Sequence, residues 1–268
     1  MRVAIHRVED NGKIVLLEGA GLAIVTLNRP THKNAMTMNM WQELKAITQS
    51  IQKNSRNQCV IFRGAGPQFT AGSDIKEFHC LGVEEAERAF MLMEEAISAV
   101  ERLSIPTIAS IDGPAIGAGM VLAAACDIRI GSPRARLGIP IGRLGITLNQ
   151  NFVHRLVRLI GPSLTKDLVY TGRMLYADEA LRWGLINYVN DEEKLEQATL
   201  RLAHRIISQS TASLKGVKEA VSLCTPIIQP APGTRPYPEF VDPQDFPEGV
   251  AAFVEKRPPR FTDKKKKA

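Results

Sequence analysis

Residues 113–130 read GPAIGAGMVLAAACDIRI, in which a turn of small residues opens a short apolar helix. A second turn of this kind, FTAGSDIKEF at residues 69–78, also follows a strand and opens a helix. The first amides of a helix have no acceptor within it and carry the positive end of its dipole, and glycine lets a ligand oxygen approach them. For either turn alone, a ligand site and a merely tight connection between helix and sheet are equally good interpretations. The two turns together favour a ligand site.

Upstream of these turns, the sequence alternates strands with helices. Two β-rich runs separated by Gly19, Ala20 and Gly21 predict a hairpin that opens the chain, and Trp41, Leu44, Ile47 and Ile51 recur at helical spacing. The predicted elements are strands at 13–18 and 22–28, a helix at 36–52, a strand at 59–62, a helix at 83–103 and an extended run at 107–111. The order of elements is typical of an α/β domain.

Downstream, the same alternation continues and then stops. We expect a helix at 120–126, a strand at 127–131, helices at 152–160 and 163–170, and a helix at 192–208. Seven prolines then punctuate residues 225–247, which predicts an extended arm, and a short amphipathic helix follows at 249–256. The expected organisation is a core at 1–195 and a C-terminal region at 196–268.

Composition and charge indicate a globular protein of a reducing compartment. The four cysteines stand singly at wide spacings, unlike a zinc site or a disulfide scaffold, and no apolar run is long enough for a membrane span. Of the net charge of +6, four charges come from Lys264–Lys267, so the basicity is mostly a C-terminal tail. These features predict a cytoplasmic protein without a metal site, and no membrane or nucleic-acid partner is expected.

Four blocks of the chain, in order, resemble the crotonase superfamily, also called the enoyl-CoA hydratase/isomerase family. They are VTLNRPTHKNAMTMNMWQEL, IFRGAGPQFTAGSDIKEF, IPTIASIDGPAIGAGMVLAAACDIRIGSPRARLGIP and YTGRMLYADEALRWGLINYV, and the resemblance covers nearly the whole chain. It implies an α/β fold, a spiral of β-β-α repeats with a helical C-terminal region. It also implies a homotrimer or hexamer that acts in fatty acid metabolism on an acyl-CoA, with coenzyme A as part of the substrate and no separate cofactor.

By motif match, the resemblance assigns the two turns to an oxyanion hole. The backbone amides of Ser73 and Ala118 would stabilise negative charge on a thioester carbonyl oxygen. Lys33 and the run Ser73, Asp74, Ile75 and Lys76 would lie near the nucleotide part of coenzyme A, with Arg29 as a weaker candidate. An aspartate at a helix start is also a typical N-cap, so Asp74 has a structural interpretation.

The chain departs from the pattern that the resemblance implies for the acid and base. Hydratases of the family resemble one another in two glutamates, and this chain has Val121 and Ile141 at those positions. Other members place an aspartate where this chain has Asn149. Because none of these three side chains can exchange a proton, hydration by a glutamate pair is not expected. All three remain candidates for contact with the acyl group.

The remaining candidate proton carriers near the site are Glu94 and, less favoured, Glu95, on the helix before Pro106. A partly buried carboxylate there would have the raised pKa that acid–base work needs, whereas charged pairs on amphipathic helices usually face solvent. Three functions therefore stay open: an acyl-CoA enzyme whose proton carrier has moved, an acyl-CoA binding protein without catalysis, and, less favoured, an RNA-binding relative that uses the lysine tail.

Overall fold

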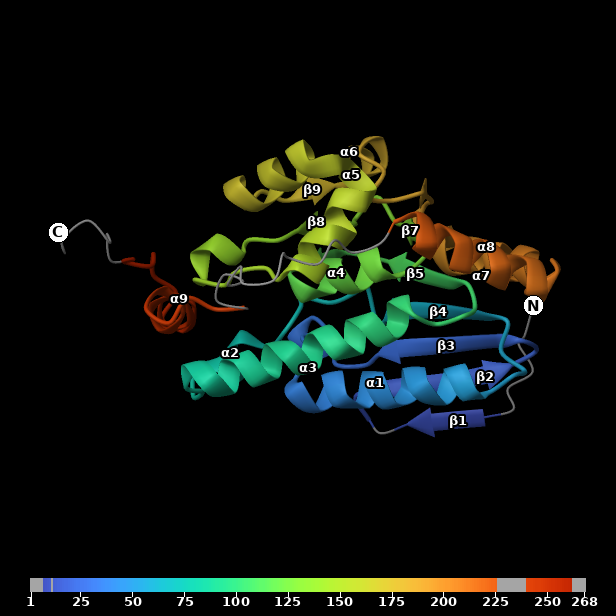
Figure 1. Ribbon diagram of the computed structural model, residues 1–268, viewed down its shortest axis with the longest axis horizontal. Coiled ribbons are helices and arrows are strands. Elements are labelled where there is room, and N and C mark those ends of the chain that lie inside the picture. Colours follow the sequence, from blue (N-terminus) through green and yellow to red (C-terminus); the bar gives the residue numbers. More distant parts are fainter. Residues whose placement is uncertain (1–6, 11, 226–239, 262–268) are drawn as a thin grey trace.

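The computed structural model describes residues 7–10, 12–225 and 240–261, and its centre is a mixed β-sheet (Figure 1). The strands are β1 Arg7–Asp10, β2 Ile14–Gly19, β3 Leu22–Leu27, β4 Cys59–Gly64, β5 Thr107–Ile111, β6 Pro114–Ile116, β7 Ile128–Gly131, β8 Arg136–Gly138, β9 Leu175–Tyr176 and β10 Tyr188–Val189. The large sheet has the order β1-β2-β3-β4-β5-β7-β10, and a small sheet has the order β6-β8-β9.

The large sheet begins antiparallel and continues parallel. β1, β2 and β3 pair antiparallel, and β3, β4, β5, β7 and β10 pair parallel. The predicted hairpin is confirmed as β2 and β3. β1 was not predicted because three of its four residues, RVED, are charged, so the pattern gives no strand signal.

The helices mostly begin and end within a few residues of their predicted positions. They are α1 Met38–Lys53, α2 Ile75–Phe78, α3 Val83–Glu101, α4 Ala118–Ala125, α5 Gln150–Thr171, α6 Ala177–Arg182, α7 Leu195–Ile207, α8 Thr211–Cys224 and α9 Asp245–Val254, with 3-10 turns at Pro30–His32, Ile141–Arg143 and Glu192–Lys194. The two helices predicted at 152–170 are the halves of α5, separated at Gly161, whose φ of 73° is not helical. The helix predicted from residue 192 starts as a 3-10 turn.

Alternate residues of the strands point to opposite faces of the sheet, and each face carries a different layer. On β3, Ala23, Val25 and Leu27 join the main core, which α1 and α3 cover. Leu22 and Ile24 join a smaller core beneath α7. α1 and α3 run side by side along the sheet in Figure 1, and α5 and α6 lie on the other side of α4 from them. The result is a layered α/β fold.

The C-terminal part differs most from the prediction. α8 was not predicted, because its sequence mixes apolar residues with lysine, serine and glycine, and none of its residues is buried. α9 begins at Asp245 rather than at residue 249, and Pro247 fits because it lies in the first helical turn. Most of the predicted arm and the lysine tail lie outside the described residues. Among the described helices, none is long and apolar enough to cross a membrane.

Candidate active site

The two small-residue turns pack against each other, backbone to backbone. Thr70 bridges to Ala115: the Thr70 amide donates to the Pro114 carbonyl at 2.9 Å, and the Ile116 amide donates to the Thr70 carbonyl at 3.1 Å. Gly72 has a φ of +90°, and a Cβ there would lie 2.5 Å from the Ile116 oxygen. A Cβ on Gly119 would lie 2.8 Å from the Thr70 oxygen. Both glycines are therefore required by close approach, and at Gly72 by conformation as well.

The amides of Ser73 and Ala118 lie at this junction and are not used by the fold. The neighbouring amides are occupied: Gly72 donates to Thr70 Oγ1 at 3.1 Å, and Asp74 donates to the Met36 carbonyl at 2.8 Å. Ala118 is the first residue of α4, so its amide has no partner inside the helix. Within the described part of the chain, neither amide has an acceptor. A Cβ on Gly72 would lie 3.3 Å from the Ala118 nitrogen, which places the two loops in contact.

The Ser73 hydroxyl is held from two sides. It accepts a hydrogen bond from Trp41 Nε1 at 3.2 Å, and it lies 3.2 Å from the Met93 sulfur, to which it donates. Trp41 is on α1 and Met93 is on α3, and both are almost fully buried. The side chain therefore ties the first turn to both helices that cover the sheet, and the Ser73 amide remains free.

Of the basic residues predicted near coenzyme A, two are exposed and one is in an ion pair. Lys33 and Lys76 are exposed, and the Lys33 carbonyl accepts the Ala71 amide at 2.9 Å, so Lys33 lies beside the first turn. Arg29 is paired instead, because its Nη1 lies 2.6 Å from Asp74 Oδ2. Asp74 also caps α2 by accepting the Lys76 amide, which confirms its predicted N-cap role. Ile75 is half-buried against the main core.

The positions predicted to contact the acyl group come from three elements. Val121 on α4 is buried, and Ile141 in the following loop packs against the same core. Asn149 caps α5, since its Oδ1 accepts the Phe152 amide at 3.0 Å. Asn151 Nδ2 donates to Glu94 Oε1 at 3.1 Å, which links the start of α5 to α3.

Glu94 is 7% exposed and sits in a closed hydrogen-bond network. Its Oε1 accepts from Arg155 Nη2 at 2.8 Å, Ser98 Oγ at 2.6 Å and Asn151 Nδ2 at 3.1 Å, and its Oε2 accepts from Arg155 Nη1 at 2.8 Å. Arg155 Nε also donates to Glu101 Oε2 at 2.8 Å. Burial alone would lower the pKa of Arg155, but the hydrogen bonds and charges of Glu94 and Glu101 raise it overall.

This network bears on the expected role of Glu94 as a proton carrier. An ionised carboxylate has about four lone-pair sites, and Glu94 accepts four hydrogen bonds from protein groups. Protein donors therefore occupy the carboxylate of Glu94, whereas a proton carrier needs an oxygen that a ligand can reach. Glu95 points to the surface, where it pairs with Lys45 at 2.7 Å.

Sequence reasoning missed Arg155, although a signal for it exists. Phe152, Arg155, Leu156 and Ile160 are the buried residues on one face of the first half of α5. An arginine within an apolar stripe at helical spacing indicates a buried ion pair, because a buried charge is costly unless it is paired. Glu87 was also missed: its Oε1 accepts the amides of Phe240 and Val241 at 3.3 and 3.0 Å.

A cavity of about 420 Å³ lies on the other face of the sheet, beneath α7. Its charged side chains include Arg63, Asp112 and Glu196. Arg63 pairs with Glu196 at 2.7 Å, and Asp112 pairs with Arg134 at 2.6 Å. None of the predicted site residues lines this cavity.

The whole-chain comparison identifies the family. The family model described as enoyl-CoA hydratase/isomerase matches residues 18–264. The chain belongs to the enoyl-CoA hydratase/isomerase family. The predicted family and the predicted crotonase-like α/β fold are thereby confirmed.

Enoyl-CoA hydratases are among its relatives in sequence. The chain is 35% identical to the short-chain-enoyl-CoA hydratase of Clostridium acetobutylicum over 91% of this chain and 95% of that protein. It is 33% identical to the crotonyl-CoA hydratase of Syntrophomonas wolfei, over 94% and 98% of the two chains.

A solved structure of the family has the same fold. The enoyl-CoA hydratase/carnithine racemase of Magnetospirillum magneticum superposes with a TM-score of 0.77 at 30% identity, covering 93% of this chain and 95% of that one. The acyl-CoA enzymes of this family are thus relatives over nearly the full length of the protein.

Proposed function

We propose that the protein acts on an acyl-CoA thioester and stabilises its carbonyl oxygen with the amides of Ser73 and Ala118. The supporting observation is that these amides lie on two loops in backbone contact and have no acceptor within the described residues. Enolate and tetrahedral intermediates of a thioester both carry negative charge on this oxygen. Fixed donors are worth several kcal/mol at such a position.

Exposed lysines beside the first turn suit the nucleotide part of coenzyme A. Lys33 and Lys76 flank that turn and are exposed, so they are available to phosphates. Arg29 is already paired with Asp74 and is the weaker candidate. Coenzyme A would then enter as part of the substrate, and the proposed setting is fatty acid metabolism in the cytoplasm.

The reaction proposed is not hydration by a pair of glutamates. Val121 and Ile141 pack in the core and cannot exchange protons. The pairing of Glu94 with Arg155 favours a positioning role, in which Glu94 fixes the start of α5 beside Asn149. The proposal is isomerisation, hydrolysis or a hydratase-like reaction through another proton carrier. Acyl-CoA binding without catalysis is the second candidate, because Val121 and Ile141 stand where the hydratases have glutamates.

We further propose that the protein assembles as a homotrimer or hexamer. α8 has no buried residue, and its Val217, Val221 and Leu223 are 63%, 49% and 74% exposed. Val217 and Val221 lie one helical turn apart on one face, and exposed apolar side chains that adjoin in this way are typical of a surface that is buried on assembly.

The experiment is to incubate the purified protein in heavy-oxygen water with saturated, 2-enoyl, 3-enoyl and aromatic acyl-CoAs. Binding of each thioester is measured first, and products are identified by mass spectrometry. Labelled hydroxyacyl-CoA would indicate hydration, labelled free acid hydrolysis, and an unlabelled double-bond isomer isomerisation. Tight binding with no product across the panel would support the non-catalytic candidate, and no binding would contradict both.

A companion variant tests Glu94. If Glu94 only positions α5, Glu94→Gln lowers the free energy of unfolding, but a folded variant retains a pH–rate profile of the same shape. Loss of turnover in a folded variant, with binding of coenzyme A within a few-fold, would restore Glu94 as the proton carrier.

A further inference from the structure

The cavity of about 420 Å³ beneath α7 lies at one end of the parallel strands β3, β4 and β5. Three isoleucines, one from each strand, form a buried row across the face of the sheet that α7 covers. Two residues further along each strand, Thr26, Arg63 and Ser110 form the next row on this face, and all three line the cavity. Ligands of α/β sheets commonly bind at the carboxyl ends of the strands, where this polar row lies.

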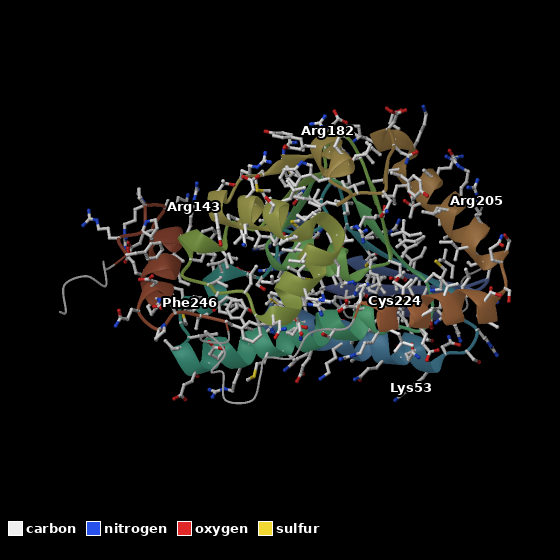
Figure 2. All side chains as sticks on the ribbon, turned by 45° about the horizontal axis from the view of Figure 1, so that its top comes forward. Lys53, Arg143, Arg182, Arg205, Cys224 and Phe246 are labelled. Atoms are coloured by element: carbon white, nitrogen blue, oxygen red, sulfur yellow. The ribbon has the colours of Figure 1, made fainter. Side chains whose placement is uncertain are left out.

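α7 covers the cavity with Leu195, Thr199 and Leu200. Thr199 Oγ1 donates to the Leu195 carbonyl at 2.8 Å, so the hydroxyl of Ser110, which lies 3.1 Å away, donates to Thr199. This contact ties the helix to the sheet and uses both hydroxyl protons. The outer side of the helix faces solvent, where Figure 2 shows Arg205 pointing away from the molecule.

Gln68 brings an unpaired polar group to the cavity. Its backbone carbonyl accepts a hydrogen bond from Asn34 Nδ2 at 2.9 Å, which fixes the backbone at this position. Its side-chain Oε1 is buried and has no hydrogen-bond partner among the described residues. Ser110 and Thr199 do not supply the missing proton, because theirs are donated elsewhere. A buried acceptor without a donor is costly, so we expect a donor group to enter the cavity and satisfy it.

The charges around the cavity favour a cation. The described residues that line it carry three carboxylates, on Asp112, Glu192 and Glu196, and one guanidinium, on Arg63. Arg63 pairs with Glu196 at 2.7 Å, and Arg134, from outside the lining, pairs with Asp112 at 2.6 Å and with Glu192 at 2.8 Å. Two cations thus face three anions, which leaves one negative charge in excess. A cationic ligand would neutralise this excess, whereas an anion would add to it.

We propose that the cavity beneath α7 is a second binding site, which takes a small organic amine. The ammonium group, which has three donors and no acceptor, would donate to Gln68 Oε1, and the apolar body would lie against Ile24, Ile61 and Leu195. The volume is in the range of small-molecule sites. Because no residue of the candidate acyl-CoA site lines the cavity, the inference goes beyond the proposed function and does not depend on it.

The test is calorimetric titration of 2-phenylethylamine into the full chain, with 2-phenylethanol and phenylacetate as probes of the same shape and different charge. We expect the amine to saturate a single site with a Kd of about 1 mM or tighter. It should bind at least about tenfold more tightly than the alcohol, and phenylacetate should bind most weakly. Saturating coenzyme A should not displace the amine.

Gln68→Leu removes the unpaired acceptor and keeps the size of the side chain. It should weaken binding of the amine by about tenfold and raise the midpoint temperature of unfolding by about 2–4 °C, because a buried unsatisfied group is lost. A merely structural role of Gln68 would lower that temperature. Gln209→Leu is the matched control, since Gln209 is exposed at the end of α7, outside the cavity lining, and it should leave binding unchanged.

Leu200→Trp is a second variant that blocks the cavity without touching Gln68. Leu200 lines the cavity and is only half-buried, so the larger ring can be accommodated by the fold and should abolish binding of the amine. No saturable binding of the amine to the wild-type protein would show that the cavity holds water only and would overturn the inference. Equal binding of the three probes, wild-type affinity in both cavity variants, or displacement by coenzyme A would also overturn it. Each of these results leaves acyl-CoA binding to be judged by its own experiment.

Discussion

The loop side of the candidate site, residues 69–73 and 114–118, is held by backbone groups, whereas the helix side, α3 and α5, is held by side chains. On the loop side, two interstrand hydrogen bonds and two glycines at close approach fix the geometry. On the helix side, the ion pair between Glu94 and Arg155 and the stacked rings of Phe90 and Phe240 do so. Backbone donors survive most substitutions, but a proton carrier is lost with one side chain. The proposed thioester site is therefore expected to tolerate substitutions that would remove an acid or a base.

The largest expected effect is on the helix side. Arg155→Met leaves Glu94 buried without its cation, and the free energy of unfolding should fall by about 3–5 kcal/mol. Arg155 is 3% exposed and donates two of the four hydrogen bonds that Glu94 accepts. Chemical denaturation measures this change. Adding Glu94→Leu to Arg155→Met should recover much of it.

Lys45→Met is the control for Arg155→Met. Lys45 on α1 and Glu95 on α3 form an exposed pair, with side chains 35% and 56% exposed. Its loss should cost less than about 1 kcal/mol. Equal effects of the two substitutions would contradict the difference between the buried and exposed pairs.

Gly72→Ala tests the loop side. A Cβ there would meet the Ile116 oxygen at 2.5 Å, and alanine is strained at a φ of +90°. The displaced turn should misalign the Ser73 amide and lower kcat/KM on any thioester that is turned over by about 10²–10³. Gly142→Ala is the control, because nothing lies within 4 Å of its added Cβ and its φ is ordinary. A folded Gly72→Ala protein with wild-type kcat/KM would show that turnover does not depend on the geometry of this turn.

Thiol labelling tests whether the core around β4 and α4, next to the loop side, stays closed in the native state. Burial raises the pKa of Cys59 on β4 and of Cys126 at the end of α4 to about 12, with Asp127 adding to the shift. Cys80, which follows α2, and Cys224, which ends α8, are exposed. At neutral pH we expect two thiols to react quickly and the other two only after denaturation. Four fast thiols would show that the region around β4 and α4 opens in the native state.

The smallest effect concerns the end of α9. Hydrogen bonds from Arg257 and from the Arg260 amide lower the pKa of Glu248 from 4.5 to about 2. Since the folded-state pKa is depressed, this contact stabilises the fold above pH 4.5 and is lost as the pH falls toward 2. The protection factor of the α9 amides, which is the exchange rate corrected for its intrinsic pH dependence, should fall over that window, and Glu248→Gln should remove this dependence. An unchanged profile in the variant would assign the acid transition to another group.

The core could be read from the sequence, because its signals are local. Strand runs such as residues 22–28, helical spacing from Trp41 to Ile51 and glycine-rich turns each specify an element independently of the rest. The pairing of Glu94 with Arg155 joins positions 61 residues apart, and the contact of Glu87 with Val241 spans 154 residues, so no local pattern encodes them. For the same reason, the place of α9 beside residues 144–147 required the structure.

A structure of the protein with bound butyryl-CoA tests the central claim most directly. The thioester oxygen should lie within about 3.2 Å of both the Ser73 and Ala118 nitrogens, with the N–H groups directed at it. A well-ordered thioester whose oxygen points away from both amides would contradict the proposed site, whatever reaction the protein carries out.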